Sequence, residues 1–373
     1  MLTRRSALAA LGTLGLAGFV PGAEGAGLRP APAQPDPRLR AFHMPLEAAR
    51  HTRTFMQWPV AASVYGRHEL ERVQQSIIDI ANTIAEFEPV VLLGADTSRS
   101  GRKSGLSGAV ELWDIPTDDL WCRDSGPTFV VDGKGALAIA HLRFNGWGGR
   151  QRCVHDSHVA ERVAARLQVP LLETGLVGEQ GGVDHDGAGL LLAHASCWVN
   201  ANRNHLGRSE IAHRLCQALG GHEMIWAPGI VGADITDYHI DALARFIGPG
   251  KVLIQVDAVM DPTDPWSRAA HQTLACLKRV RGMTGRKLEI VTVPEPEHTR
   301  SKAPDFVSSY INYYVCNGAV IAAQFGDSRT DGIVEETLSE LYPGRKIRML
   351  NIDPLGESGG GIHCATQQQP MGV

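Results

Sequence analysis

The feature that most constrains the fold is a recurring alternation of short apolar runs, tight turns and amphipathic stretches. Turn dipeptides typical of β-hairpins stand between apolar runs at Asp132-Gly133, Asp186-Gly187 and Asn317-Gly318. Such turns join antiparallel neighbours, so the sheets are predicted to be at least partly antiparallel. The pattern returns about five times without a clean sequence repeat. It therefore predicts an α/β protein of about five hairpin-plus-helix modules.

Strand-length runs rich in branched residues alternate with helical patterns along the chain. Strands are expected at 90–93, 129–131, 190–192, 251–256 and 288–293, and helices over 69–86, 158–167, 208–219, 266–284 and 332–341. At 373 residues and 43% hydrophobic content, the chain can bury a large core. No Pro-, Gly- or Ser-rich linker follows residue 44, so residues 44–373 are predicted to form a single domain.

Residues 1–26 have the pattern of a twin-arginine signal peptide. Arg4-Arg5 precede an apolar run over 7–20, Pro21 ends this run, and small residues follow. The run of about fourteen residues is shorter than the roughly 20 that span a bilayer, which favours a cleaved signal over a stable membrane anchor. Residues 27–43, rich in Pro, Ala and Gly, are predicted to be a disordered linker. The sequence thus predicts a periplasmic or secreted protein.

Charge and cysteine usage exclude several classes of protein. The net charge is −4 and Lys and Arg are dispersed, so no nucleic acid is expected as a partner. The seven cysteines include no CxxC pair, which argues against a disulfide framework. None has a partner at zinc-site spacing, so no metal is expected. Because the twin-arginine route carries folded proteins, free thiols are compatible with export.

The segment Gly359–Cys364 places a thiol on a glycine-rich turn close to the C-terminus. Glycines at 359–361 would let a small substrate reach the sulfur and let backbone N–H groups converge on it. Cys364 is therefore a candidate nucleophile and Gly361 a candidate substrate contact. The alternative is a buried core cysteine, since free thiols are among the most buried side chains.

Two further segments hold side chains suited to a planar cation. Trp121 and Asp124 stand three apart, so a carboxylate could accept paired N–H bonds while the indole stacks; the alternative is an Asp that caps a turn. His239 and Asp241 are separated by one residue, and in a strand they would share a face. The alternative for His239 is a structural, hydrogen-bonded histidine.

A third polar segment runs from Gly178 to Gly187. Gly181-Gly182 allow a tight bend behind the carboxylate of Glu179. Residues 184–186 are interpreted as loop residues. A calcium or zinc loop is the sharper alternative, but the spacing fits neither an EF-hand nor a zinc site.

Together these residues resemble the agmatine deiminase and bacterial (Porphyromonas-type) peptidylarginine deiminase family of the guanidine-modifying, or pentein, superfamily. The resemblance is carried in order by residues 44–47, 51–59, 121–127, 144–149, 202–204, 234–241, 309–312 and 359–370. It implies a five-bladed, pseudo-symmetric α/β propeller around a central active site. Residues 44–373 would then be the deiminase catalytic domain.

The resemblance also implies roles for the candidate residues. They are Cys364 as nucleophile, His239 as general acid/base, Asp124 and Asp241 as carboxylates that grip a guanidinium, Glu179 as a further acidic contact, Trp121 as an aromatic wall and Asn312 as a polar pocket residue. The thiolate would add to the guanidinium carbon, His239 would protonate the departing ammonia, and water would cleave the thiouronium intermediate. No metal or organic cofactor is required.

The carboxylates have an electrostatic consequence for the nucleophile. They should raise the pKa of Cys364, whereas a bound guanidinium should lower it again, which amounts to substrate-assisted deprotonation.

The chain departs from the family pattern at two places beside the predicted site. Relatives usually read Glu-Gly-Gly-Ser-Ile-His where this chain has Glu179 to Asp184, and they have glycine where it has Tyr238. We expect the bulky Tyr238 ring to narrow or reshape the substrate pocket.

The expected reaction is deimination of agmatine to N-carbamoylputrescine and ammonia, a step of putrescine biosynthesis and polyamine metabolism. The alternative is citrullination of arginine, free or in peptides. Outside this class stand a catalytically inactive periplasmic guanidine or polyamine binder and, less favoured, a zinc hydrolase. The implied partner is a small guanidinium substrate, and the resemblance implies homo-oligomers, since relatives are often dimers or larger.

Overall fold

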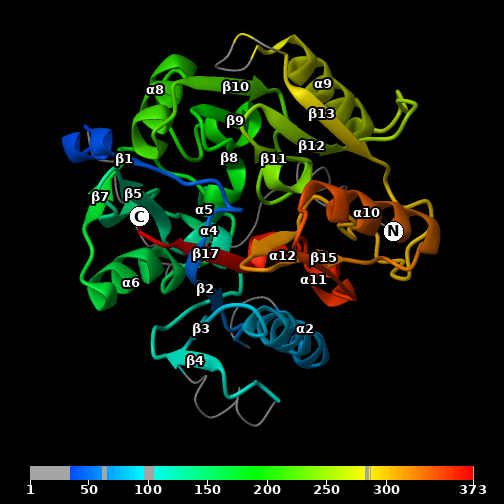
Figure 1. Cartoon of the computed structure of the whole chain (residues 1–373), viewed down its shortest axis with the longest axis horizontal. Coiled ribbons are helices and arrows are strands. Elements are labelled where there is room, and N and C mark those ends of the chain that lie inside the picture. The colour runs from blue at the N-terminus through cyan, green and yellow to red at the C-terminus, as the bar shows by residue number, and fades with distance from the viewer. Residues whose placement is uncertain (1–33, 61–64, 96–104, 282–284, 286, 373) are drawn as a thin grey trace, which may run out of the picture.

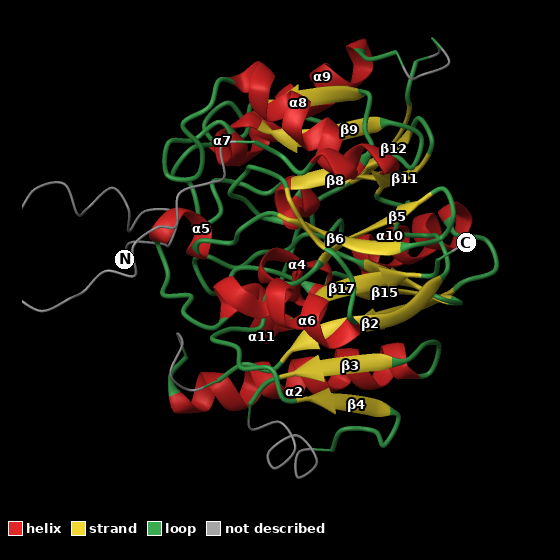
Figure 2. Ribbon diagram, turned by 90° about the vertical axis from the view of Figure 1, so that its left-hand side faces the viewer, coloured by secondary structure: helices red, strands yellow, loops and turns green. Residues whose placement is uncertain are grey.

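Five β-sheets surround a common centre in the computed structural model, which describes residues 34–60, 65–95, 105–281, 285 and 287–372 (Figure 1). The first sheet orders its strands β17 (Thr366–Pro370), β2 (His51–Gln57), β3 (Val90–Leu93) and β4 (Val110–Trp113). The second orders them β1 (Phe42–His43), β5 (Thr128–Asp132), β6 (Leu137–His141) and β7 (Leu171–Glu173). Strands of the different sheets run across the molecule in a similar direction (Figure 2).

The other three sheets have three strands each. They are β10 (Glu223–Ala227), β9 (Leu190–His194) and β8 (Val183–His185); β11 (Ala244–Gly248), β12 (Lys251–Gln255) and β13 (Glu289–Val293); and β14 (Tyr314–Cys316), β15 (Ala319–Ala323) and β16 (Lys346–Leu350). In every sheet, one strand pairs antiparallel with one neighbour and parallel with the next. Each module is thus a hairpin, a crossover helix and a parallel strand.

The crossover helices confirm the five expected helices, with differences at their ends. They are α2 (Arg67–Ala85), α6 (Val159–Leu167), α8 (Arg208–Leu219), α9 (Pro265–Arg279) and α10 (Ser328–Leu341). Helix α10 begins earlier than expected because Asp327 caps it and accepts hydrogen bonds from the backbone of Arg329 and Thr330. Helix α9 ends at Arg279, before the expected 284, because Val280 is already extended.

The three predicted hairpins are confirmed, as β5–β6, β8–β9 and β14–β15 pair antiparallel. Strands β9 and β15, each the middle strand of a three-stranded sheet, are buried along their whole length. The first module is built from both ends of the chain, since C-terminal β17 pairs with β2 near the N-terminus. This pairing closes the ring of sheets and brings the C-terminal segment to its centre (Figure 1).

The short helices lie mainly between modules. The single-turn α-helices are α4 (Cys122–Ser125), α5 (Gly146–Gly149), α7 (Ala195–Trp198), α11 (Asp353–Glu357) and α12 (Ile362–Ala365). The 3-10 helices are η1 (Pro37–Ala41), η2 (Asp156–His158), η3 (Gln180–Gly182) and η4 (Ile240–Ala242). In the described part of the chain, every helix is too short or too polar to cross a bilayer.

The predicted disordered linker over 27–43 is wrong at its C-terminal end. Pro37–Ala41 forms η1, and Phe42–His43 pairs with Val131 and Asp132 of β5. Leu39 is fully buried in a core cluster with residues of α8, and this apolar anchor outweighs the Pro-rich composition. The predicted signal peptide over 1–26 lies outside the described residues.

Leu39→Ala should lower the free energy of unfolding by about 2–5 kcal/mol, because it removes a fully buried side chain from the N-terminal segment. The midpoint of urea-induced unfolding measures this change. Val259→Ala is the matched control: Val259 is 81% exposed, and a shift within about 0.5 kcal/mol is expected. Equal midpoints for the two variants would contradict the anchoring role of Leu39.

Candidate active site

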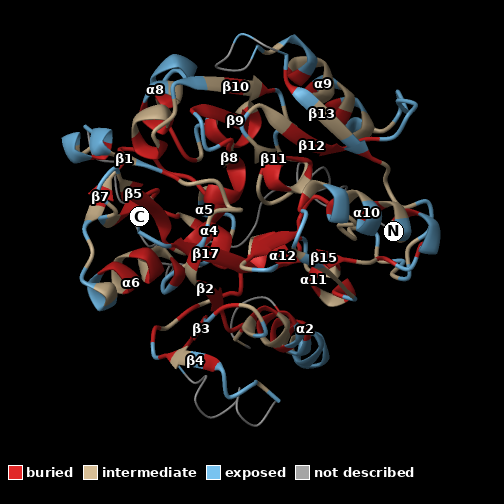
Figure 3. Cartoon of the chain, in the orientation of Figure 1, coloured by how far each residue is buried: buried red, intermediate tan, exposed pale blue. Residues whose placement is uncertain are grey.

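Each of the five modules contributes one candidate residue at an equivalent place. The residue stands just before the first strand of the module's hairpin, where the chain enters from the centre of the ring. These residues are Cys364 before β17, Asp124 before β5, Glu179 before β8, Asp241 before β11 and Asn312 before β14. The pseudo-symmetry of the fold therefore gathers residues that are far apart in the sequence, and their segments are largely buried (Figure 3).

The side chains converge tightly on Gly181. A Cβ atom at this position would lie 2.7 Å from Asp124 Oδ1, 2.8 Å from His239 Nδ1 and 3.1 Å from Asp241 Oδ2. Gly181 is thus required because no side chain fits among these three groups. The structure brings together Asp124, His239 and Asp241 as the sequence predicted.

The Cys364 thiol is held by an amide and lies next to a carboxylate. Asn312 Nδ2 donates to Cys364 Sγ at 3.0 Å, and Asn312 Oδ1 accepts from the Cys364 backbone N–H at 3.1 Å. Asp241 Oδ2 lies 3.5 Å from the sulfur. Burial, followed by the charges of Asp241 and Asp124, raises the pKa of Cys364 well above its usual value. The pKa direction agrees with the expectation from the sequence.

Two of the glycines before Cys364 allow close packing. A Cβ atom at Gly360 would lie 2.5 Å from the Trp121 ring, and one at Gly361 would lie 2.6 Å from Asn312 Oδ1. Trp121, 8% exposed, therefore lies directly against the segment that carries the nucleophile. Gly361 acts by admitting Asn312 to the backbone of the nucleophile segment.

Two carboxylates at the centre each keep one oxygen without a hydrogen-bond partner among the described residues. Asp124 Oδ2 accepts from Trp147 Nε1 at 2.8 Å, and Asp241 Oδ2 lies 2.8 Å from His363 Nδ1. Oδ1 of Asp124 and Oδ1 of Asp241 are buried and have no hydrogen-bond partner among the described residues. Buried acceptors without donors are costly, so a ligand rich in N–H groups, such as a guanidinium, suits this site.

The two carboxylates differ in their pKa shifts. Burial raises the pKa of Asp124 to about 6, although nearby His239 opposes the shift. For Asp241, burial acts in the same direction, but the hydrogen bond and charge of His363 outweigh it, and the pKa is lowered. Both carboxyl groups are therefore mainly ionised at neutral pH, and Asp241 keeps its charge to lower pH than Asp124.

His239 is placed to act as an acid. Its Nε2 lies 3.2 Å from Glu179 Oε2, and its Nδ1 lies 3.6 Å from Asp124 Oδ1. Burial alone would lower its pKa, but Asp124 and Glu179 outweigh burial and raise the pKa to about 9. His239 thus holds a proton at neutral pH that it can give to a leaving group.

Glu179 acts on His239 and is itself held by Arg203, a residue that the sequence analysis did not single out. Arg203 Nε donates to the two Glu179 oxygens at 3.0 and 2.9 Å, and Nη1 donates to Asp237 Oδ2 at 2.8 Å. Burial would raise the pKa of Glu179, but Arg203 and His239 lower it. The acidic contact expected for Glu179 is therefore made to the imidazole of His239.

His239 and Asp241 do not lie in a strand, so they do not share a face by strand alternation. His239 precedes η4 and Asp241 lies within it. Asp237 and Tyr238 have φ values of 61° and 71°, which end any extended run, and Asp234 Oδ1 accepts from the Tyr238 N–H at 3.1 Å. This turn still brings both predicted side chains into one site.

The Tyr238 ring lies in the protein core, whereas the expectation placed it beside the substrate. Its ring centroid lies 4.6 Å from those of His194 and Trp266, and the ring is buried in a core cluster around β12 and α9. Its left-handed backbone, with φ of 71°, explains why the family pattern has glycine here. The substitution changes the core behind the site.

Other contacts were missed because they join distant segments. Trp147, which holds Asp124, and Arg203 lie within segments that carried the family resemblance, at 144–149 and 202–204. His363 and Glu47 lie in such segments as well. The residue types were therefore visible in the sequence, but their partners were not.

The loop at 184–186 is structural, as interpreted from the sequence. Asp186 Oδ1 accepts from the backbone of Ala188 and Leu190 in the hairpin turn, and Asp184 Oδ2 accepts from the Phe246 N–H. Across the described residues, no group of three His, Cys, Asp or Glu side chains could hold a metal ion.

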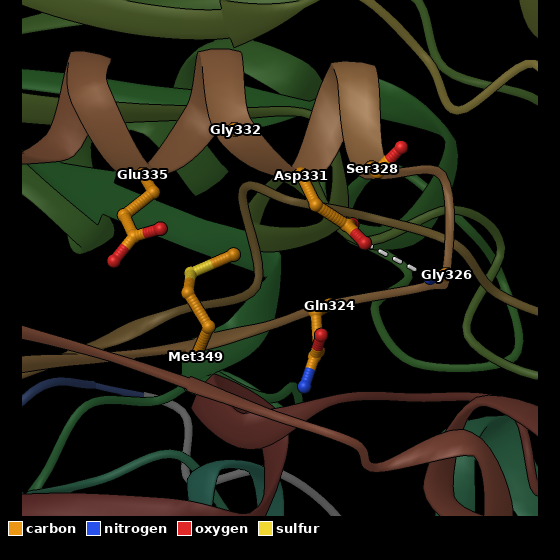
Figure 4. Close-up of a pocket in the computed structure, with 7 residues that line it drawn as sticks. All are labelled: Gln324, Gly326, Ser328, Asp331, Gly332, Glu335 and Met349. Atoms are coloured by element: carbon orange, nitrogen blue, oxygen red, sulfur yellow. Dashed lines mark hydrogen bonds between the residues drawn. The ribbon is translucent and has the colours of Figure 1, made fainter.

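A surface pocket of about 290 Å³ lies elsewhere, beside α10 (Figure 4). It is lined by Gln324, Gly326, Ser328, Asp331, Gly332, Glu335 and Met349. Asp331 is already used, because it accepts from the Tyr310 hydroxyl and from the N–H groups of Phe325 and Gly326. This pocket shares no residue with the candidate site.

The chain is similar to known deiminases over most of its length. The model of the Porphyromonas-type peptidyl-arginine deiminase family matches residues 43–370. The chain is 34% identical over 361 residues to an agmatine deiminase of Ectopseudomonas mendocina, with 90% of this chain and 97% of the relative covered. It is 32% identical over 370 residues to an agmatine deiminase of Medicago truncatula, with 90% and 98% covered.

A solved agmatine deiminase of Enterococcus faecalis superposes with a TM-score of 0.83 at 25% identity, covering 92% of this chain and all of that one. The chain therefore belongs to the Porphyromonas-type peptidyl-arginine deiminase family. The expected α/β fold of five modules is confirmed.

Alkylation of Cys364 by iodoacetamide should have a pH midpoint well above that of an ordinary thiol, because Asp241 and Asp124 disfavour the thiolate. Asp241→Asn should lower this midpoint, and so should guanidinium chloride in the site of the unsubstituted protein. Mass spectrometry of the Cys364 peptide measures the profile, with the Cys216 peptide from the same digest as internal reference. Identical profiles with and without the cation would contradict substrate-assisted deprotonation.

Proposed function

We propose that this chain is an agmatine deiminase that hydrolyses agmatine to N-carbamoylputrescine and ammonia. The observation that carries the proposal is the pair of buried oxygens without a hydrogen-bond partner among the described residues, Asp124 Oδ1 and Asp241 Oδ1, beside the Cys364 thiol. A guanidinium has five or more N–H donors in one plane and can satisfy both oxygens at once. The cation also lowers the pKa of the neighbouring thiol, so the nucleophile forms when the substrate binds.

The reaction follows from the placement of the charged groups. As the guanidinium binds, the Cys364 thiol loses its proton to solvent, and the thiolate sulfur adds to the guanidinium carbon. His239, protonated at neutral pH, donates a proton to the departing nitrogen, so that a C–N bond breaks and ammonia leaves. The product of this step is an S-alkylthiouronium. His239, now neutral, takes a proton from water, the water adds to the same carbon, and the C–S bond breaks to release the ureido product.

The burial of the site favours a slender free substrate. Asp124 is 7% exposed and Asp241 is 2% exposed, so the guanidinium must enter fully to reach them. Relatives over nearly the whole chain are named agmatine deiminases. Both observations support agmatine over an arginine side chain within a polypeptide.

Citrullination of arginine is the second candidate, favoured by the name of the matching family. An inactive guanidine-binding protein is a third candidate. It would need the carboxylates and Trp121 but neither Cys364 nor the proton held by His239. The contact of Asn312 with both the backbone and the sulfur of Cys364 indicates a thiol positioned for chemistry.

The chain without residues 1–26 should release ammonia from agmatine, and much more slowly or not at all from free arginine or an arginyl peptide. Cys364→Ser should lower kcat by about 10³-fold or more while agmatine binding stays measurable, because only the nucleophile is changed. Coupled ammonia detection and calorimetry measure the two properties.

Cys216→Ser, in the half-buried stretch of α8, is the matched control and should retain full activity. Ammonia release from arginine or the peptide in preference to agmatine would replace the proposed substrate. A fully active Cys364→Ser variant would refute the nucleophile.

We infer from the sequence of residues 1–26 that the chain is exported by the twin-arginine route, which would make it a periplasmic or secreted enzyme. Arg4→Lys together with Arg5→Lys should retain the precursor in the cytoplasm, since this route reads the arginine pair. Fractionation of a bacterium that expresses either precursor, followed by immunoblotting, measures export. Equal export of the two precursors would contradict this inference.

A further inference from the structure

Two residues in the segments that carried the family resemblance have no role in the reaction described above. They are Glu47, at the end of residues 44–47, and His363, the residue before the nucleophile. The structure joins them: His363 Nε2 lies 2.9 Å from Glu47 Oε2, and His363 Nδ1 lies 2.8 Å from Asp241 Oδ2. All three side chains are at least nine-tenths buried.

Glu47 is an acceptor at both of its oxygens. Oε1 lies 2.8 Å from Arg245 Nη2 and accepts a hydrogen bond from the Val315 N–H at 2.9 Å. Oε2 lies 3.3 Å from Arg123 Nη2. Burial would raise the pKa of Glu47, but Arg245, His363 and Arg123 lower it well below its usual value. Glu47 therefore has no proton to offer to His363, and the hydrogen bond between them needs an N–H at Nε2.

The same reasoning applies to the other ring nitrogen. Asp241 Oδ2 also accepts from the Cys364 thiol at 3.5 Å, so this oxygen carries no proton and can only accept from His363 Nδ1. A neutral imidazole carries one N–H and therefore satisfies one carboxylate. Two acceptor oxygens, one at each ring nitrogen, require a proton on each nitrogen.

We propose that His363 is a doubly protonated imidazolium, held between Glu47 and Asp241, and that it positions Asp241 for the substrate cation. It is a positioning residue, because it acts through Asp241. By occupying Oδ2 it fixes the plane of the carboxylate and leaves Oδ1, which has no partner among the described residues, for the guanidinium. The positioning role rests on the proposed function, whereas the protonation state does not.

Three carboxylates and one guanidinium face His363 from the neighbouring elements, so the carboxylates favour a cation there and Arg123 opposes it. Glu47 and Asp241 contact the ring, and Asp184 of β8 acts at longer range. The Arg123 guanidinium donates from Nε to the His363 carbonyl at 3.3 Å and also binds Glu47. Loss of either ring proton would replace a hydrogen bond with a contact between two acceptors.

Nitrogen-15 NMR of the histidine rings tests the protonation state in the unsubstituted protein at pH 7.5. His363→Gln identifies the signal by its disappearance. We expect both ring nitrogens of His363 to carry a proton, because each lies 2.8 or 2.9 Å from an acceptor oxygen. A neutral ring with a single protonated nitrogen would overturn the proposal. This readout needs no substrate, so it stands even if agmatine is not turned over.

Steady-state kinetics with agmatine test the positioning role. His363→Gln should lower kcat/KM by about 10- to 100-fold, mainly through KM, because Asp241 loses a charge-assisted hydrogen bond. His141→Gln is the matched control, since His141 is also buried and contacts a carboxylate, with Nδ1 3.1 Å from Glu173 Oε1, outside the site. It should leave kcat/KM unchanged.

An unchanged kcat/KM in His363→Gln, or the same loss in both variants, would overturn the positioning role. A failure of the proposed function looks different: the unsubstituted protein would then release no ammonia from agmatine, while the NMR result would still report the charge of His363.

Discussion

Burial of several carboxylates around one thiol is the constraint on which this structure depends. A buried carboxylate without compensation would lose its charge or destabilise the fold. Arg203 compensates Glu179, and Arg245 together with Arg123 compensates Glu47. These ion pairs stand outside the reacting centre. They allow Glu179 and Glu47 to remain ionised and to hold the imidazoles of His239 and His363.

At the centre of the site, the negative charges of Asp124 and Asp241 are not fully compensated, and this leaves them able to bind a guanidinium beside the thiol. Asp124 and Asp241 have no arginine at hydrogen-bond distance among the described residues, and one oxygen of each lacks a donor. The thiol of Cys364 consequently has a raised pKa beside negative charge. A guanidinium would supply the missing donors and the missing positive charge together, which links binding of the substrate to formation of the nucleophile.

The ring of modules makes this arrangement available. Each hairpin begins at the centre, so one residue before each first strand reaches the site. The pairing of β17 with β2 delivers Cys364 to the same place and joins the two ends of the described chain. Substitutions that weaken this pairing should therefore affect the nucleophile as well as stability.

Local pattern was sufficient for the hairpins and the crossover helices, because turn dipeptides and periodicity are properties of neighbouring residues. The roles of the site residues were predicted from the family resemblance of their motifs. Local pattern failed where a distant contact prevails, as at Leu39, whose burial against α8 orders a Pro-rich segment, and at Tyr238, whose ring packs against Trp266. Charge pairing across long separations was equally hidden, since Glu47 meets His363 from the opposite end of the chain. The amino-acid sequence contains every group of the site, but the protonation and orientation of those groups depend on neighbours that only folding brings within a few ångströms.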